Sequence, residues 1–134
     1  MSLYCTSLLQ DAADELGVDE GNERYKRRFV NAINRTLDEI SLDSDLASAY
    51  AHISSTDDTI SIDEVYGWIV YAGLIYHLIR MGQRPSDPKL ALLIYQDSKE
   101  RWNYAKGMYQ TGELNELQSV ATNNIINFGS MSDS

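Results

Sequence analysis

One segment limits the possible folds of this chain more than any other feature of the sequence. Residues 65–79 read VYGWIVYAGLIYHLI, and this run of fifteen residues contains no acidic or basic side chain except His77. A helix that is apolar on nearly every side has to be covered on most of them, by helices of its own chain or by another subunit. The run is too short for a transmembrane helix, which needs about 20 residues. We therefore expect a covered helix in an all-α protein without membrane contact.

The seven residues GQRPSDP, which begin at Gly82, predict how this helix ends and how the next one begins. Gly82 suits a left-handed residue just after a helix. Ser86 or Asp87 can cap the following helix, and Pro88 fits its first position. The sequence therefore predicts a tight antiparallel pair of helices.

Two further helices are expected before the apolar segment. Thr6 or Ser7 can cap the first, and Gly17 suits its end. Asn22 can cap the second, which has the clearest amphipathic pattern in the chain. Its expected buried face consists of Tyr25, Phe29, Ile33, Leu37 and Ile40. The four expected helices cover about residues 7–16, 23–40, 63–81 and 88–112. Together they predict a small four-helix bundle.

Charge is unevenly distributed on the second expected helix. Five of the chain's eleven basic residues lie on its polar side: Arg24, Lys26, Arg27, Arg28 and Arg35. Three interpretations are open, namely a solvated face, a contact with an acidic neighbouring subunit, and a direct contact with DNA. The net charge of −9 disfavours the binding of nucleic acid by bulk electrostatics.

Two segments depart from the helical pattern. Residues 41–63 alternate in hydrophobicity near AHIS and TISI, which predicts a short β-hairpin or a long loop inserted between helices. Beyond Gly112 the helical period is lost, and Asn, Ser and Thr dominate. The sequence therefore predicts a helical domain at residues 1–112 and an extended C-terminal arm at residues 113–134.

No constellation of residues predicts a catalytic, cofactor or metal site. His52 and His77 lie in different expected elements, and neither has a second ligand at a helical interval. Adjacent carboxylates such as Asp57 and Asp58 are normally solvated when they lie in loops. The single cysteine, Cys5, excludes an internal disulfide and a cysteine-based zinc site. We therefore expect no enzyme activity, no cofactor and no metal.

The segment IDEVYGWIVYAGLIYHLIRMGQRPSDPKLALLIYQDSKERW, residues 62–102, resembles the head-to-tail adaptor (connector) proteins of tailed bacteriophages. In that family a Tyr-rich helix ends in a short turn that contains proline, and the next helix carries a tyrosine and a run of mixed charge. The resemblance covers about residues 2–110. It is a resemblance of layout, without a diagnostic chemical motif.

This resemblance implies a structural protein of the virion that is made in the host cytoplasm. Such adaptors form a ring of about twelve subunits. The ring lies at the neck, the head–tail junction, beneath the portal, where it extends the DNA channel. The implied partners are further copies of the chain, the portal protein and a tail or nozzle protein. Double-stranded DNA is expected to pass through the ring without specific binding.

The residues that we expect at these contacts fall into three groups. The expected subunit interface consists of Arg24, Arg27, Arg28, Tyr66 and Tyr71. The expected portal-binding residues of the arm are Leu117, Ile125, Ile126 and Phe128. The expected residues of the loop that faces the tail are Ile53, Asp57, Asp58 and Ile60.

Two other classes of function compete with the adaptor. One is a small acidic helical regulatory or inhibitor protein that binds a single protein partner through its acidic surface. The other, which is the least favoured, is an enzyme whose site lies among Tyr66, His77 and Trp102. The mass of the assembled protein separates the first alternative from an adaptor, because an inhibitor stays monomeric or forms a 1:1 complex.

Overall fold

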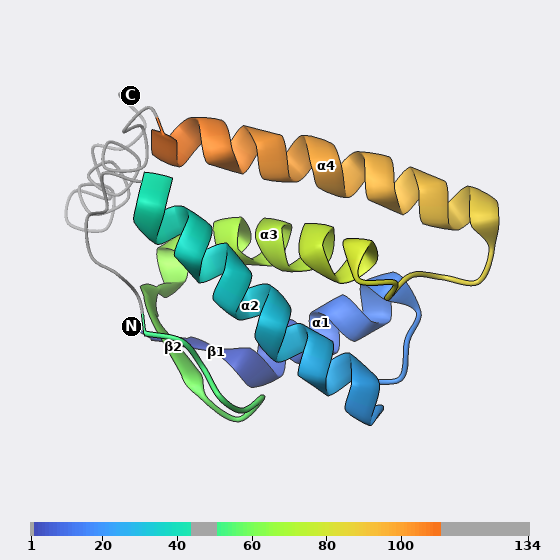
Figure 1. Cartoon of the computed structure of the whole chain (residues 1–134), viewed down its shortest axis with the longest axis horizontal. Coiled ribbons are helices and arrows are strands. Elements are labelled where there is room, and N and C mark those ends of the chain that lie inside the picture. The colour runs from blue at the N-terminus through green and yellow to red at the C-terminus, as the bar shows by residue number, and fades with distance from the viewer. Residues whose placement is uncertain (1, 44–50, 111–134) are drawn as a thin grey trace, which may run out of the picture.

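The computed structural model describes residues 2–43 and 51–110. This part of the chain is mostly helical, as the sequence predicts, and it also contains a sheet of two short strands (Figure 1). The elements in chain order are β1 (Ser2–Tyr4), α1 (Cys5–Leu16), α2 (Glu23–Asp43), β2 (Thr59–Asp63), the 3-10 turn η1 (Glu64–Tyr66), α3 (Gly67–Arg80) and α4 (Pro88–Gln110).

Helix α3, which contains most of the apolar segment, lies at the centre of the molecule. Figure 1 shows α4 along one side of α3, α1 on the other side and α2 crossing in front of α3, and α3 contacts all three. Nine of the fourteen residues of α3 are buried. The cover that this helix requires therefore comes largely from its own chain.

The amphipathic face of α2 is confirmed. All five predicted residues, from Tyr25 to Ile40, have an exposed fraction of 0%. The Asn22 side chain caps the helix, because its Oδ1 accepts a hydrogen bond of 3.0 Å from the Tyr25 N–H. The Tyr25 hydroxyl donates to the Leu9 carbonyl oxygen at 2.6 Å, which joins α2 to α1.

The predicted helix ends are mostly confirmed, with one exception at α1. Gly17 and Gly82 both adopt positive φ angles, of 68° and 97°, after the helices that they follow. The Asp87 Oδ1 accepts a hydrogen bond of 3.0 Å from the Lys89 N–H at the start of α4. The prediction that Thr6 or Ser7 caps α1 is wrong, because β1 leads directly into a helix that begins at Cys5.

The sequence left a short hairpin or a long loop open for residues 41–63, and the described residues 51–63 form a loop followed by one strand. Strand β2 pairs with β1 in antiparallel register, with Leu3 opposite Ile60, and residues 51–58 form no strand. The side chain of Asn34 holds Ile53 through both of its backbone groups, at 2.9 Å and 2.8 Å. The alternating pattern around AHIS thus reflects a loop bound by α2. Helix α2 also extends into this segment, to Asp43.

Two other predictions lie outside the described residues. These are the boundary of the helical domain at residue 112 and the C-terminal arm, with Leu117, Ile125, Ile126 and Phe128.

Side chains of α2 and α4 pack tightly against α3 at Gly73. A Cβ atom added to Gly73 would lie 2.5 Å from Thr36 Cγ2 and 3.0 Å from Trp102 Cζ3. The Thr36 hydroxyl is held by a hydrogen bond of 2.8 Å to the Ala32 carbonyl oxygen, so it has little freedom to move aside. We therefore expect Gly73→Ala to lower the free energy of unfolding by about 1 to 3 kcal/mol through overpacking, as measured by urea denaturation.

The matched control for this substitution is Gly107→Ala in α4. A Cβ atom at Gly107 would meet nothing within 4 Å. Because alanine is favoured over glycine inside a helix, this variant should be neutral or more stable by up to about 1 kcal/mol. Equal unfolding midpoints for the two variants would contradict the close approach at Gly73.

Candidate functional site

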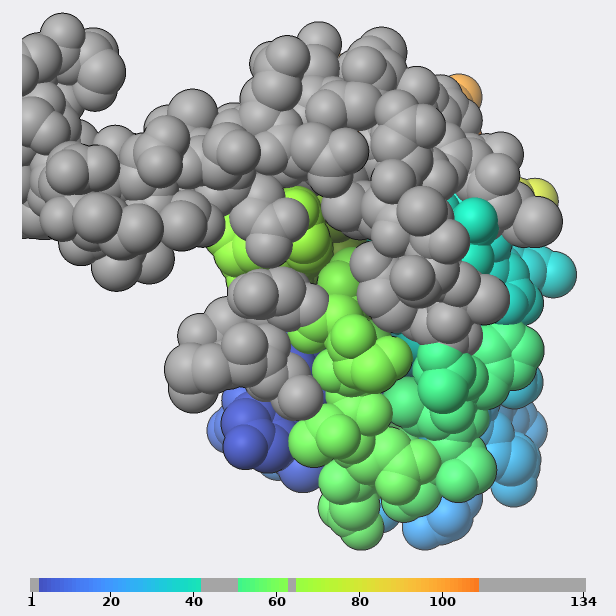
Figure 2. Space-filling model, turned by 90° about the vertical axis from the view of Figure 1, so that its left-hand side faces the viewer, coloured from blue at the N-terminus to red at the C-terminus, as the bar shows by residue number. Residues whose placement is uncertain are grey.

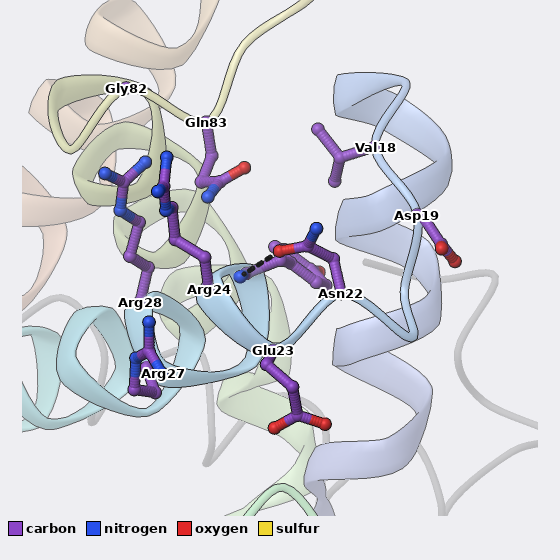
Figure 3. Close-up of a pocket in the computed structure, with 10 residues that line it drawn as sticks. Val18, Asp19, Asn22, Glu23, Arg24, Arg27, Arg28, Gly82 and Gln83 are labelled. Carbon is purple, nitrogen blue, oxygen red and sulfur yellow. Dashed lines mark hydrogen bonds between the residues drawn. The ribbon is translucent and has the colours of Figure 1, made fainter.

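A pocket of about 590 Å³ lies between the start of α2, the loop that precedes it and the turn that follows α3 (Figure 3). All three arginines of the predicted subunit interface line it, together with Gly82 and Gln83 of the turn. We call this concavity the arginine pocket. It brings together residues that are more than fifty positions apart in the sequence.

Helix α2 positions the arginines of the pocket. Residues 24, 27 and 28 are spaced at intervals of three and four, which places them on one side of a helix. In Figure 3 the guanidinium groups of Arg24 and Arg28 point toward Gly82 and Gln83, whereas Arg27 lies further from the turn. Within residues 2–43 and 51–110, no carboxylate forms an ion pair with any of these three side chains.

Two carboxylates also line the pocket, but each has a partner of its own. The Asp19 Oδ1 accepts a hydrogen bond of 3.0 Å from the Gly21 N–H. The Glu23 Oε1 lies 4.0 Å from the Lys26 Nζ. The positive charge of the arginines is therefore not paired with these acids, in a chain whose net charge is −9.

Gln83 contributes a buried polar group to the same pocket. Its exposed fraction is 8%, and its backbone N–H donates to the Leu78 carbonyl oxygen at 3.0 Å. Its side-chain amide makes no hydrogen bond to any residue that the structure describes. Figure 3 shows this side chain pointing from the turn toward Arg24. The sequence analysis missed Gln83, because no motif or period distinguishes a glutamine that follows a helix end.

The two tyrosines predicted at the subunit interface lie away from this pocket. Tyr66 precedes α3, whereas the pocket lies beyond the last residue of that helix, and only 4% of Tyr66 is exposed. The half-buried Tyr71 donates a hydrogen bond of 3.0 Å from its hydroxyl to the Glu15 Oε1. Burial, with the nearby charge of Glu15, raises the pKa of Tyr71 above its ordinary value. Both side chains are thus used within the chain.

The predicted tail-side loop has an apolar inner side and a polar outer side. Ile53 and Ile60 are buried, while Asp57 is exposed. The Asp58 Oδ2 accepts hydrogen bonds from the backbone N–H groups of Ser54 and Ser55, at 2.8 Å and 3.0 Å. These bonds lower the pKa of Asp58. Figure 2, which shows the left-hand side of Figure 1, has residues 51–62, in green, on the surface that faces the viewer.

The alternative interpretation as an enzyme placed a site among Tyr66, His77 and Trp102, and these residues lie in the core. His77 is 2% exposed and Trp102 is 1% exposed, and their rings meet edge to face with centroids 6.0 Å apart. Burial lowers the pKa of His77 to about 4, with smaller effects from Arg35 and Arg80. Like Tyr66, these two side chains fill the interior and present no accessible reacting atom.

Residues 2–43 and 51–110 contain no group of three or more His, Cys, Asp or Glu side chains that could hold a metal ion. Among the helices of these residues, none combines the length and the apolar character that crossing a membrane requires.

The arginine pocket is not the only notable feature of the described surface, because apolar side chains of α3 and α4 are also exposed. Figure 1 shows that α4 extends beyond α3 on the side of the connecting turn. Leu92 and Leu93 of α4 are 55% and 63% exposed. Further along, Trp68 of α3 and Tyr104 of α4 are also exposed, and their ring centroids are 5.9 Å apart. The chain thus has apolar surface that its own described elements leave uncovered.

Comparison with known proteins gives no relative of this chain, since no protein-family model, no curated protein and no solved structure matches it.

Proposed function

We propose that the chain is a head-to-tail adaptor of a tailed bacteriophage. In this proposal a small four-helix bundle with an extended C-terminal arm assembles into a ring beneath the portal at the neck of the virion. The ring extends the DNA channel and docks the tail. The protein is a structural component and not an enzyme. The layout of residues 62–102, which is similar to that of the adaptor family, supports this assignment.

The observation that carries the proposal is the arginine cluster without acidic partners on an otherwise acidic chain. Arg24, Arg27 and Arg28 lie on one side of α2 and form no ion pair with a described carboxylate. The net charge of −9 leaves an excess of acidic groups for a second copy to offer. A contact between a basic surface of one copy and an acidic surface of the next is heterologous, and such contacts form a ring when the rotation between copies closes.

The exposed apolar side chains of α4 support the same assembly. Leu92 and Leu93 are neighbouring residues of α4, and both are more than half exposed. Apolar side chains that gather on one part of a surface often mark a site of protein contact. A neighbouring subunit would cover them. In the proposed interface these leucines take the role that the sequence analysis gives to Tyr66. The Tyr66 side chain is buried and has little surface that a neighbouring subunit could contact.

The remaining contacts of the adaptor are assigned to other parts of the chain. The arm at residues 113–134, with Leu117, Ile125, Ile126 and Phe128, would bind the portal protein. The loop around Asp57, which is exposed, would face a tail or nozzle protein. The acidic charge of the ring would repel DNA phosphates, so that double-stranded DNA passes without specific binding.

The arginine cluster gives a direct test of ring formation. Reversing Arg24, Arg27 and Arg28 to Glu together should abolish assembly on the portal ring while the monomer stays folded, because like charges would then face each other across the contact. Native mass spectrometry of the chain, alone and with portal protein, measures the assembly, and circular dichroism measures the fold.

The matched control reverses three basic residues outside the arginine pocket, on α2 and from the middle of α4 onward: Arg35, Lys99 and Lys106. This variant has the same net charge as the first and should still assemble. Normal rings from both variants, at low and at high salt, would show that the cluster is only a solvated face. A wild-type chain that stays monomeric with portal protein would instead favour the small regulatory or inhibitor protein.

A further inference from the structure

We propose that the arginine pocket is a binding site for a phosphate-type dianion, with Arg24, Arg28 and Gln83 as its donors. The site is complete within one chain, so this inference goes beyond the adaptor proposal and does not depend on it.

The donors of the site come from two elements and converge on one space. Arg24 and Arg28 are one helical turn apart on α2, and in Figure 3 both guanidinium groups point toward the turn that carries Gln83. The amide of Gln83 points back toward them from that turn. Charged guanidinium groups together with an amide form an arrangement that binds oxyanions through charge-assisted hydrogen bonds.

Gln83 is the observation that points to a ligand. It is 8% exposed, and its amide has no hydrogen-bond partner among the described residues. Its amide atoms are not among the fully enclosed unpaired polar atoms of the described residues, so they remain accessible from the pocket that Gln83 lines. An anion between Gln83 and the two arginines can therefore accept hydrogen bonds from this amide.

Gly82 allows the turn to approach the arginines closely. A Cβ atom at Gly82 would lie 3.3 Å from the Arg28 Nη1, a distance that would press on the guanidinium group. The φ angle of 97° also favours glycine at this position. The backbone of the turn can therefore stand close beside the guanidinium group of Arg28.

The geometry favours a tetrahedral dianion over a carboxylate. A carboxylate has two oxygens and pairs well with a single guanidinium group. A phosphate has more oxygens, which can accept from both arginines and from the amide at once. The N-terminus of α2 also lines the pocket through Asn22 and Glu23, and its positive dipole end favours the second negative charge.

A bound phosphate would exclude another occupant of the same space. In the proposed ring, carboxylates of a neighbouring subunit use Arg24 and Arg28. The dianion and the neighbour are therefore alternative occupants of these two side chains.

Titration of the full-length chain with inorganic phosphate tests the site. The backbone amide signals of Gly82 and Gln83 are followed by two-dimensional NMR at pH 7, with sodium chloride holding the ionic strength constant. We expect saturable shifts of these signals in the wild-type chain. Arg28→Met and Gln83→Leu should each weaken phosphate binding about tenfold, because each removes donors to a charged ligand. Arg35→Met removes one charge from the same helix outside the pocket and should leave the affinity unchanged.

Acetate and a short DNA duplex in parallel titrations distinguish other anions. Acetate, which carries a single charge and two oxygens, should give no saturable shift in the millimolar range that phosphate covers. Acetate binding as tight as phosphate binding, or tighter binding of the duplex, would overturn the proposal. Wild-type phosphate affinity in a folded Arg28→Met variant would also overturn it, even if Gln83→Leu failed to fold.

Discussion

Replacing Trp102 by alanine is expected to lower the free energy of unfolding by about 3 to 5 kcal/mol. The side chain is 1% exposed and is one of the largest that the fold buries completely. It extends from α4 to the point where α3 has Gly73 and meets the ring of His77 edge to face. Its removal would leave a cavity where α4 packs on α3, and rigid neighbouring helices could collapse into it only in part.

Tyr104 provides the matched control for Trp102. It is an aromatic residue of the same helix, but it is 64% exposed. Tyr104→Ala should change the free energy of unfolding by less than about 1 kcal/mol. Urea denaturation of both variants measures the difference. A loss below about 1 kcal/mol for Trp102→Ala would contradict the packing of α4 on α3.

The stability of the protein is expected to fall as the pH drops from about 6.5 to about 4, because His77 is buried in its neutral form. Its pKa is lowered from 6.5 to about 4 by burial first, and then by the charges of Arg35, Arg80 and Lys106. The Glu39 Oε1 lies 3.4 Å from the Nε2 of His77 and favours the charged form, but burial and the three cations outweigh it.

The sign of the effect follows from proton binding. Between pH 4 and 6.5 the unfolded chain binds a proton at His77 that the folded chain does not bind, so stability rises with pH across this window. The full contribution, up to about 3 kcal/mol, is present above the unfolded pKa and is lost as the pH falls toward the folded pKa.

Two histidine variants separate this effect from the titration of carboxylates. His77→Leu removes the buried titrating group and should flatten the dependence of the unfolding free energy on pH between 4 and 6.5. His52→Gln removes an exposed histidine, which lies 2.7 Å from Asp38, and should keep most of the wild-type dependence. An unchanged slope in a folded His77→Leu variant would show that other groups cause the loss of stability.

The sequence predicted the helices well because the signals that define them are local. The buried face of α2 follows from the spacing of Tyr25 and the four apolar residues after it, and its start follows from Asn22. The end of α3 follows from Gly82 in the same way. Each of these signals lies within a few residues of the boundary that it sets, so the rest of the fold does not have to be known.

The sheet could not be predicted for the opposite reason. Its partner residues, such as Leu3 and Ile60, are almost sixty positions apart, and no short-range pattern connects them. The alternation in residues 41–63 indicated extended chain correctly for β2, but it could not indicate which segment would pair with that strand.

The candidate site was predicted in part. The spacing of Arg24, Arg27 and Arg28 indicates a basic side of α2, and the structure places all three around one pocket. Gln83 could not be found, because its burial arises only when the turn after α3 lies against α2. Tyr66, which the sequence analysis places at the interface, is buried within the chain, and an aromatic side chain that suits an interface equally suits a core.

The pairing of β1 with β2 has a consequence for the order in which the chain folds. Helices α3 and α4 are joined by a short turn and contact each other along their length, so this pair can form early from neighbouring residues. Strand β1 is expected to pair later, because its partner strand lies almost sixty residues away in the sequence. Closing so long a loop costs conformational entropy before the hydrogen bonds between the two strands can form. Strand β1 is therefore expected to pair late, although it precedes all four described helices in the sequence.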